Sequence, residues 1–196
     1  MRKISPLMAV IALCCLAFFA GCSQQKSAER EANEQQPSSS TQQTREAPEQ
    51  QPSGDQRFLV EASQDGKAEI ELGQVAASRA ASPSVKKLAQ KIVSDHTKAN
   101  QQLESLPQAS QALQSAGVPQ EKSNTIDRLS QLSGKEFDQA FVEQLVQDHE
   151  SAITQFKQAA ASAQDPGVKQ FASKTLPTLE QHLQMAKALQ GGKGQH

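Results

Sequence analysis

The chain contains no tryptophan and no tyrosine, so its few aromatic residues are all phenylalanine. These absences remove the side chains that most often stack on sugars and nucleobases. The formal net charge is only −1, and the sequence has no run of basic residues. A basic surface is the usual electrostatic signature of nucleic-acid binding. We therefore expect no nucleic-acid partner.

Cysteine is also scarce, with three residues that all lie within the first 22 positions. Cys14 and Cys15 lie in an apolar run, so the removal of a signal peptide would leave Cys22 alone. A single cysteine forms neither an internal disulfide nor a cysteine metal cluster. The sequence also lacks a Gly-x-Ser-x-Gly elbow and a phosphate-binding glycine loop. No catalytic residues are predicted, and we do not expect an enzyme.

The N-terminus is typical of an exported protein. Two basic residues precede the apolar run 7–20, which is too short to span a bilayer comfortably, so residues 1–21 are predicted to be a signal peptide. The segment 19–22, Phe-Ala-Gly-Cys, resembles the lipobox of bacterial lipoproteins, in which the cysteine becomes the new N-terminus and carries the lipid. By this resemblance Cys22 is the predicted lipidation (palmitate) site, and, by resemblance to lipoprotein sorting in two-membraned bacteria, Ser23 after it favours the outer membrane, facing the periplasm. The alternative is an ordinary secretory signal cleaved near Ser23.

Residues 22–54 are predicted to be a disordered tether. From Ser23 to Gly54 the sequence has no Val, Ile, Leu, Phe or Met, so this segment cannot bury enough apolar surface to offset the entropy of ordering. Such a chain has an end-to-end distance on the order of 30 Å. The remaining residues are enough for one domain, predicted over 55–190 and followed by a flexible tail over 191–196.

Helical periodicity runs through the predicted domain, and no segment alternates as a strand would, so the predicted fold class is all-α. Ser82 with Pro83, a Ser133 capping box, and Asp165 are the expected helix starts, and Pro177 is expected to kink the last helix. The predicted helices are 55–81, 83–105, 124–132, 133–163 and 166–190.

An internal repeat indicates how these helices are arranged. Residues 81–89 parallel residues 164–172, and each copy lies at a tight turn between two long helices. The unit is therefore a helical hairpin that occurs twice. The connection 107–132 between the copies is long enough to cross the full length of a bundle. Two hairpins joined by a long crossover define the ferritin-like form of the four-helix bundle.

The blocks "AEIELGQVAASRAASPSVKKLAQKIVSDHTKAN" and "LSGKEFDQAFVEQLVQDHESAITQFKQAA…DPGVKQFASKTLPTLEQHLQMA" resemble the bacterial domain-of-unknown-function family numbered 4142. The resemblance covers roughly residues 56–189, which is essentially the whole predicted domain. It implies a ferritin-like helical bundle that is exported and often assigned to the outer membrane. It implies no established activity.

Three of the four histidines lie in apolar helical stripes, where leucine would be the ordinary residue. The stripes place His96 among Leu88, Ile92, Ala99 and Leu103, His149 among Val142, Val146, Ile153 and Phe156, and His182 among Ala172, Leu179, Ala186 and Leu189. A polar ring on a core-facing side needs a hydrogen-bond partner or a metal ion. The fourth, His196, lies in a polar tail and is expected to face solvent.

Counting residues from the two turns predicts that these three histidines meet Glu69 near the middle of the bundle, since a helix rises about 1.5 Å per residue. Ferritin-like di-iron sites use a Glu-x-x-His motif on each of two helices. None of the three histidines has a glutamate three positions before it. A di-iron oxidase is therefore disfavoured, because neighbouring helical residues point about 100° apart and cannot chelate as an i, i+3 pair does.

Two interpretations of this layer stay open. In one, His96, His149 and His182, with Glu69 as a fourth ligand, hold a single transition metal ion such as zinc, iron, copper or nickel. In the other, which is favoured, the histidines form a satisfied polar layer that fixes helix register. Its expected partners are Glu69, Asp95, Asp148, Glu150 and Glu180.

The leading functional hypothesis is accordingly a lipid-anchored envelope protein that carries a non-enzymatic binding or structural module, with a role in stress tolerance. The alternative is a metal-binding or metal-dependent redox protein that uses the histidine cluster. A third hypothesis is assembly with an unidentified envelope protein through an exposed apolar patch.

Overall fold

The structure is a computed structural model that describes residues 53–109, 113 and 116–192. The predicted signal peptide, Cys22, the tether up to residue 52 and the tail with His196 lie outside these residues. The helices are α1 (Gly54–Arg79), α2 (Pro83–Glu104), α4 (Gln120–Ser130), α5 (Gly134–Ser162) and α6 (Pro166–Gly191). Within the described ranges the β structure consists of one isolated bridge, between Ala80 and Gly134.

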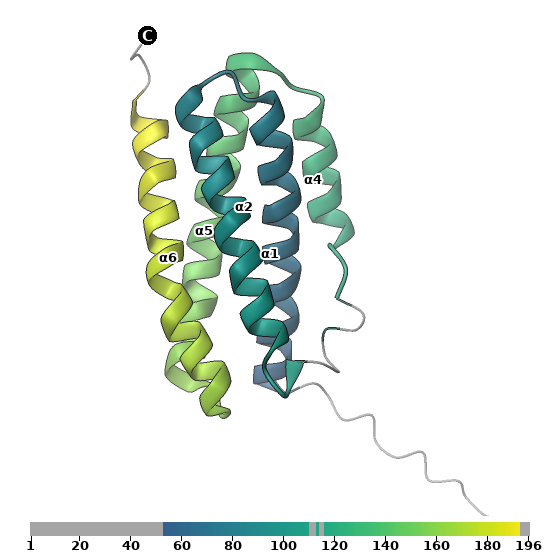
Figure 1. Ribbon diagram of the computed structural model, residues 1–196, viewed down its shortest axis with the longest axis vertical. Coiled ribbons are helices and arrows are strands. Elements are labelled where there is room, and N and C mark those ends of the chain that lie inside the picture. Colours follow the sequence, from purple (N-terminus) through teal and green to yellow (C-terminus); the bar gives the residue numbers. More distant parts are fainter. Residues whose placement is uncertain (1–52, 110–112, 114–115, 193–196) are drawn as a thin grey trace, which may run out of the picture. The chain divides into compact units, whose positions relative to one another are not determined.

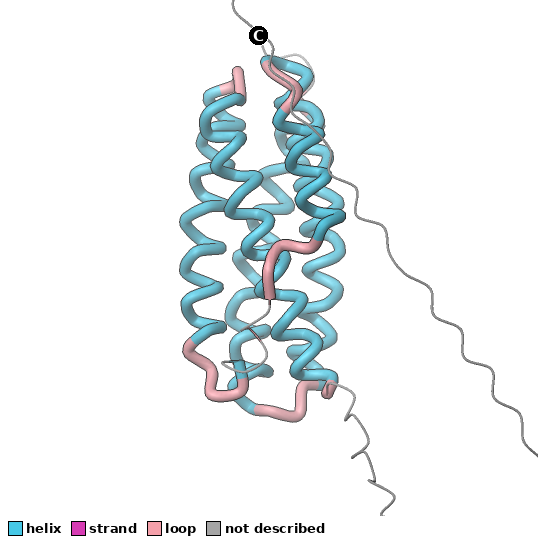
Figure 2. The backbone as a smooth tube through the Cα atoms, turned by 90° about the vertical axis from the view of Figure 1, so that its right-hand side faces the viewer, coloured by secondary structure: helices cyan, strands magenta, loops and turns pink. Residues whose placement is uncertain are grey.

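The helices form two hairpins joined by a long crossover. α1 packs most extensively on α2, and α5 on α6, while the smaller contacts of α1 with α5 and of α2 with α6 close the bundle. The α1–α2 and α5–α6 turns lie at opposite ends (Figure 1). The described loops gather at these two ends, except for residues 116–119, which lead into α4 along the side (Figure 2). The predicted ferritin-like four-helix bundle is confirmed.

The short helix α4 covers one side of the bundle, where it contacts α1 and α5. It begins at Gln120, earlier in the chain than the predicted start at Asn124. α6 remains one helix across Pro177. Among the described residues, no helix has the length and apolar character needed to cross a bilayer.

The helix starts follow the predicted positions, but not all of the predicted side-chain bonds form. Pro83 and Pro166 occupy the first helical turn of α2 and α6, and Asp165 accepts hydrogen bonds from the amides of residues 167–168. Ser133 is the N-cap of α5, but the predicted capping box there is wrong, since its side chain makes no cap bond. Gly134 instead turns the chain into the helix with a φ of 63°, which glycine adopts at little cost.

Two aspartates, which we call the turn clamps, hold the hairpin turns. Asp138 of α5 accepts hydrogen bonds of 3.0 and 2.8 Å from the amides of residues 81–82 in the α1–α2 turn. Asp55 of α1 accepts bonds of 3.2 and 2.7 Å from the amides of residues 164–165 in the α5–α6 turn. The separation of Asp55 from Asp138 along the chain equals that of Pro83 from Pro166. The repeat therefore extends beyond the turns, and each hairpin locks the turn of the other.

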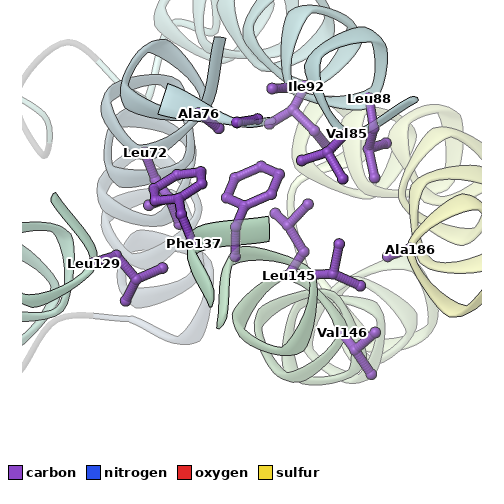
Figure 3. Close-up of a cluster of buried hydrophobic side chains, with 14 of the residues drawn as sticks. Leu72, Ala76, Val85, Leu88, Ile92, Leu129, Phe137, Leu145, Val146 and Ala186 are labelled. Carbon is purple, nitrogen blue, oxygen red and sulfur yellow. The ribbon is translucent and has the colours of Figure 1, made fainter. Parts of the chain in front are cut away.

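The core consists of two apolar clusters. The first joins side chains from all five helices, including Leu72, Ile92, Leu129, Leu145 and Ala186, which converge in Figure 3. The second contains three phenylalanines and three leucines among its buried residues, including Phe58, Leu59, Leu103, Phe156 and Phe171. Burying one such large side chain stabilises the fold by about 1.5–3 kcal/mol. On α2, α5 and α6 the histidine of the predicted layer lies between residues of the two clusters, while on α1 Glu69 directly follows Ala68 of the first cluster.

Candidate metal centre

Each of the four long helices contributes one residue of the predicted layer. Glu69 comes from α1, His96 from α2, His149 from α5 and His182 from α6. The side chains of His149 and His182 are only 1% exposed, and that of Glu69 is 7% exposed. The helical stripes account for this placement, because each residue takes a core-facing position between apolar neighbours. The structure brings all four together, as the sequence predicts.

The two most deeply buried rings face each other. His149 Nε2 lies 3.2 Å from His182 Nδ1. The outer nitrogen of each ring has its own partner: His149 Nδ1 lies 3.0 Å from the Leu145 carbonyl oxygen, and His182 Nε2 lies 2.9 Å from Asp95 Oδ2. A carbonyl oxygen and a carboxylate are acceptors. Asp95 therefore accepts the proton of His182 Nε2, and the Leu145 carbonyl can accept a proton from His149 Nδ1.

These outer partners decide what lies between the rings. A neutral imidazole carries one N–H, so donation by both outer nitrogens leaves a lone pair on each inner nitrogen. Burial lowers the pKa of His149 to about 4, and burial also lowers the pKa of His182 against the opposing effect of Asp95. With both rings uncharged, the tautomer in which both outer nitrogens donate leaves two lone pairs 3.2 Å apart, whereas the tautomer with the proton on His149 Nε2 donates a hydrogen bond to His182 Nδ1. Two occupants of the space between the rings therefore fit the geometry, namely the ring proton of a neutral His149 or a metal ion bound to both inner nitrogens.

Glu69 and His96 complete the layer with two unpaired atoms. Glu69 Oε1 lies 3.3 Å from His149 Nδ1, while Glu69 Oε2 lies 3.9 Å from His96 Nε2. These last two atoms have no hydrogen-bond partner within the part of the chain that the structure describes. Burial, followed by the proximity of His149 and His182, lowers the pKa of His96 to about 3. Burial and the charge of Asp148 raise the pKa of Glu69 well above its usual range.

The three imidazoles form a set of metal donors. One ring nitrogen from each of His96, His149 and His182 lies within 4.8 Å of the others. Tetrahedral metal–imidazole bonds of about 2.0–2.1 Å place two ligand nitrogens about 3.3 Å apart. The His149–His182 pair already has that spacing, so only the His96 ring has to approach. Asp95 and the Leu145 carbonyl hold the far sides of two rings, as the partners that orient metal-bound imidazoles do.

Of the predicted polar-layer partners, Asp95 and Glu69 contact the histidines and three others do not. Asp148 pairs instead with Lys122 and Gln144. The expectation that Glu150 and Glu180 join the layer is wrong. They form ion pairs on the exposed surface with Lys187 and Lys157, respectively. The physical reason is helical geometry, since Glu150 and Glu180 lie one and two positions from a buried histidine and so point about 100° and 200° away from it around the helix.

The contribution of the crossover helix was not predicted from the sequence. Lys122 of α4 bridges Asp65 of α1, at 3.1 Å, and Asp148 of α5, at 3.3 Å. The two aspartates raise the pKa of Lys122 although burial opposes this effect. Asp148 follows Asp65 at the same spacing that separates the two turn clamps. Extending the repeat beyond its turns would have paired these two residues, but nothing local in the sequence indicates Lys122.

The fold and this centre together define a class of protein, namely a ferritin-like helical bundle with a buried three-histidine layer in place of a carboxylate di-iron site. Residues 39–189 match a family described as domain of unknown function (DUF4142). The chain belongs to this family, which confirms the resemblance seen in the sequence. No curated protein matches the chain.

Two solved structures share the fold. A DUF305 fragment from Deinococcus radiodurans is 17% identical, with a TM-score of 0.61, over 71% of this chain and 97% of that one. A DUF305 protein from Streptomyces coelicolor, described as secreted, is 15% identical, with a TM-score of 0.58, over 74% of this chain and 98% of that one. At such low identity the likeness concerns the fold alone.

Proposed function

We propose that this protein is an exported, lipid-anchored helical bundle that binds one first-row transition metal ion through His96, His149 and His182. The observation that carries the proposal is the convergence of one ring nitrogen from each of the three histidines within 4.8 Å, with His149 Nε2 and His182 Nδ1 only 3.2 Å apart. A divalent cation among these nitrogens would be coordinated by the neutral rings. The lowered pKa values of the histidines favour the neutral rings that a metal requires.

The lack of the Glu-x-x-His motif distinguishes this centre from a di-iron oxidase. Three neutral nitrogen donors suit zinc, copper, nickel or cobalt better than the hard cations magnesium and calcium, which prefer oxygen ligands. Glu69 lies outside the set of three converging nitrogens, so we assign it to a neighbouring position rather than to the fourth ligand.

The location in the cell envelope rests on the sequence around Cys22. A signal peptide, a lipobox-like segment and an apolar-free tether support acylation of Cys22 and display of the bundle beyond a lipid surface. Incorporation of labelled palmitate in a bacterial host tests this part, with Cys22→Ala as the variant expected to abolish it. Labelling of Cys22→Ala at the level of the unmodified chain would rule out this anchor.

The test of metal binding is the metal content of protein purified without a histidine tag, after exposure to Zn²⁺, Cu²⁺, Ni²⁺ and Co²⁺ followed by buffer exchange. We expect about one ion per chain for at least one of these metals, with an increase in thermal stability that depends on metal concentration. In His149→Leu both the bound ion and the metal-dependent stabilisation should be lost.

A matched control is His196→Ala, which removes the histidine that no helical stripe includes. This variant should keep the metal content of the unmodified chain. Substoichiometric metal in the unmodified protein with every ion, or equal metal in His149→Leu, would contradict the proposal.

A second candidate is a purely structural bundle in which a proton occupies the position assigned to the metal. The chain of contacts from Glu69 through His149 and His182 to Asp95 favours it, because alternating donors and acceptors along this chain also satisfy the rings. In this case His149→Leu should fold with equal or greater stability, as replacements of buried polar groups by apolar ones often do. Unchanged stability on metal addition would support this second candidate.

A further inference from the structure

A cavity of about 70 Å³ adjoins the candidate metal centre. Glu69, Asp95, His96 and His182 form part of its wall, and two buried polar residues, Asn100 and Thr175, form another part. The unpaired atoms Glu69 Oε2 and His96 Nε2 thus belong to residues that border this space. The cavity is therefore in direct contact with residues of the candidate metal centre.

The internal repeat explains why the cavity exists. The positions equivalent to His149, His182 and Glu69 in the other hairpin are Gly66, Ala99 and Ala152, respectively, and all three smaller residues line the cavity. The position equivalent to His96 is Leu179, which also lines it. One half of the middle of the bundle is thus filled by the polar layer, and the equivalent half is left open.

At Gly66 the chain can carry a larger side chain only if a neighbouring side chain moves. A Cβ atom built there would collide with the side chain of Asn100 on α2. Ala99 and Ala152 are the positions at which the repeat could have accommodated more volume. The open space is therefore a property of particular residues and not of loose packing between helices.

The size of the cavity limits its occupant. A water molecule takes up about 30 Å³ in the liquid, whereas pockets for organic ligands are about 300–1,000 Å³. The cavity can hold a few water molecules or a ligand of one to three heavy atoms, but no organic cofactor. Three imidazoles leave a tetrahedral metal ion with one open position, which is the arrangement of reactive zinc sites rather than of closed structural ones.

The charge around the cavity favours an anion on the metal. Neutral imidazoles do not reduce the charge of a divalent ion, and the Lys122 ammonium lies on the same cavity wall. Asp95 pairs with His182 and Lys91, and Asp65 and Asp148 pair with Lys122, whereas Glu69 Oε2 has no hydrogen-bond partner among the described residues. Resting on the proposed metal site, we infer that the metal keeps an open position toward this cavity and binds a small monoanion of one to three heavy atoms.

The probe is azide added to the copper(II)-loaded full-length protein, with free copper removed beforehand. We expect a saturable azide-to-copper charge-transfer band with one azide per bound copper. Ala99→Leu fills the cavity, so it should retain copper while its azide affinity falls about tenfold or more, because the added carbons occupy the ligand's space. Ala161→Leu, the same change at an exposed position of α5, should bind azide as the unmodified chain does.

The outcomes separate this inference from the function on which it rests. Copper bound at one ion per chain without any azide band shows a closed site, which overturns the open position and leaves metal binding intact. Equal azide affinity in Ala99→Leu and the unmodified protein shows that the anion does not occupy this cavity, and also overturns the inference. Failure to bind any metal removes both proposals together.

Discussion

The hairpin of α1 and α2 aligns in sequence with the hairpin of α5 and α6 when Pro83 is matched to Pro166, and the two hairpins differ in an informative way. Structural devices occur in both copies, namely the turn clamps Asp55 and Asp138 and the two helix-starting prolines. The four residues of the candidate metal centre have no polar counterparts. Their equivalents are Gly66, Ala99, Ala152 and Leu179.

This difference teaches that the scaffold and the site obey separate constraints. The two turn clamps stabilise the bundle in the same way, since equivalent backbone amides need an acceptor at each of the two turns. A polar residue in the middle of a bundle is costly, so it is found only where its partners are present. The asymmetric layer, with a cavity in the equivalent half, is therefore a feature of the centre and not of the repeat.

The largest expected effect tests whether the duplicated core positions are equivalent. Phe58 and Phe141 occupy matching positions of the repeat and are 8% and 0% exposed, respectively. Phe141→Ala should lower the free energy of unfolding by about 3–5 kcal/mol, because it removes transfer energy and leaves a cavity. Phe58→Ala should cost somewhat less because of its greater exposure. Urea unfolding measures both, and a Phe141→Ala loss smaller than that of Phe58→Ala would contradict the comparison.

Low pH should destabilise the metal-free protein through the candidate metal centre, whose residues have no polar equivalents in the repeat. The folded pKa values of His96 and His149, about 3 and about 4, lie below the ordinary value of 6.5. The unfolded chain therefore binds more protons below pH 6.5, and stability is lost as the pH falls toward these values. The raised pKa of Glu69 acts in the opposite direction, since its contribution is lost as the pH rises. We expect a net loss of about 2 kcal/mol between pH 6.5 and 5.

Urea unfolding in the presence of a chelator measures this pH dependence. His149→Leu serves as the comparison, because it removes one titrating ring and should reduce the slope of stability against pH. A slope that is the same in both proteins would show that His149 is not held neutral in the folded state.

The turn clamps should give smaller, matched effects. Asp55→Ala and Asp138→Ala each remove the acceptor of two backbone hydrogen bonds at a turn that is partly exposed. Each change should cost about 1–2 kcal/mol, since solvent replaces part of the lost bonds. Equal losses in urea unfolding would support the repeat of structural devices. A loss confined to one of the two would break the proposed equivalence.

The smallest effects should come from the exposed ion pairs. Glu150→Ala and Glu180→Ala remove surface partners of Lys187 and Lys157. Such pairs contribute about 0–1 kcal/mol, so we expect changes within about 0.5 kcal/mol and no change in metal content. Loss of bound metal in either variant would show that the replaced glutamate contributes to the histidine layer. Asp95→Asn, which touches His182 directly, is the positive comparison and should weaken metal binding.

Much of the fold could be predicted because its signals are local. Apolar spacing, the two proline-started helices and the repeated turn determine the bundle and its hairpins. The sequence at Ser133 could not distinguish a capping box from an uncapped helix start. The chain enters α5 at Gly134 with a positive φ, and the Ser133 side chain makes no cap bond. The ion pairs of Lys122 could not be predicted either, because its partners lie on α1 and α5 and no spacing within α4 indicates them.

The sequence by itself determined that three histidines and Glu69 share core-facing positions at one level of a ferritin-like bundle. Helical geometry converts residue spacing directly into face and depth, so this much needs no tertiary information. Only the tertiary structure decided which nitrogens face each other, which carboxylate holds His182 and where the cavity lies. These depend on contacts between helices of about 3 Å, and a shift or rotation too small to alter the sequence pattern would change every one of them.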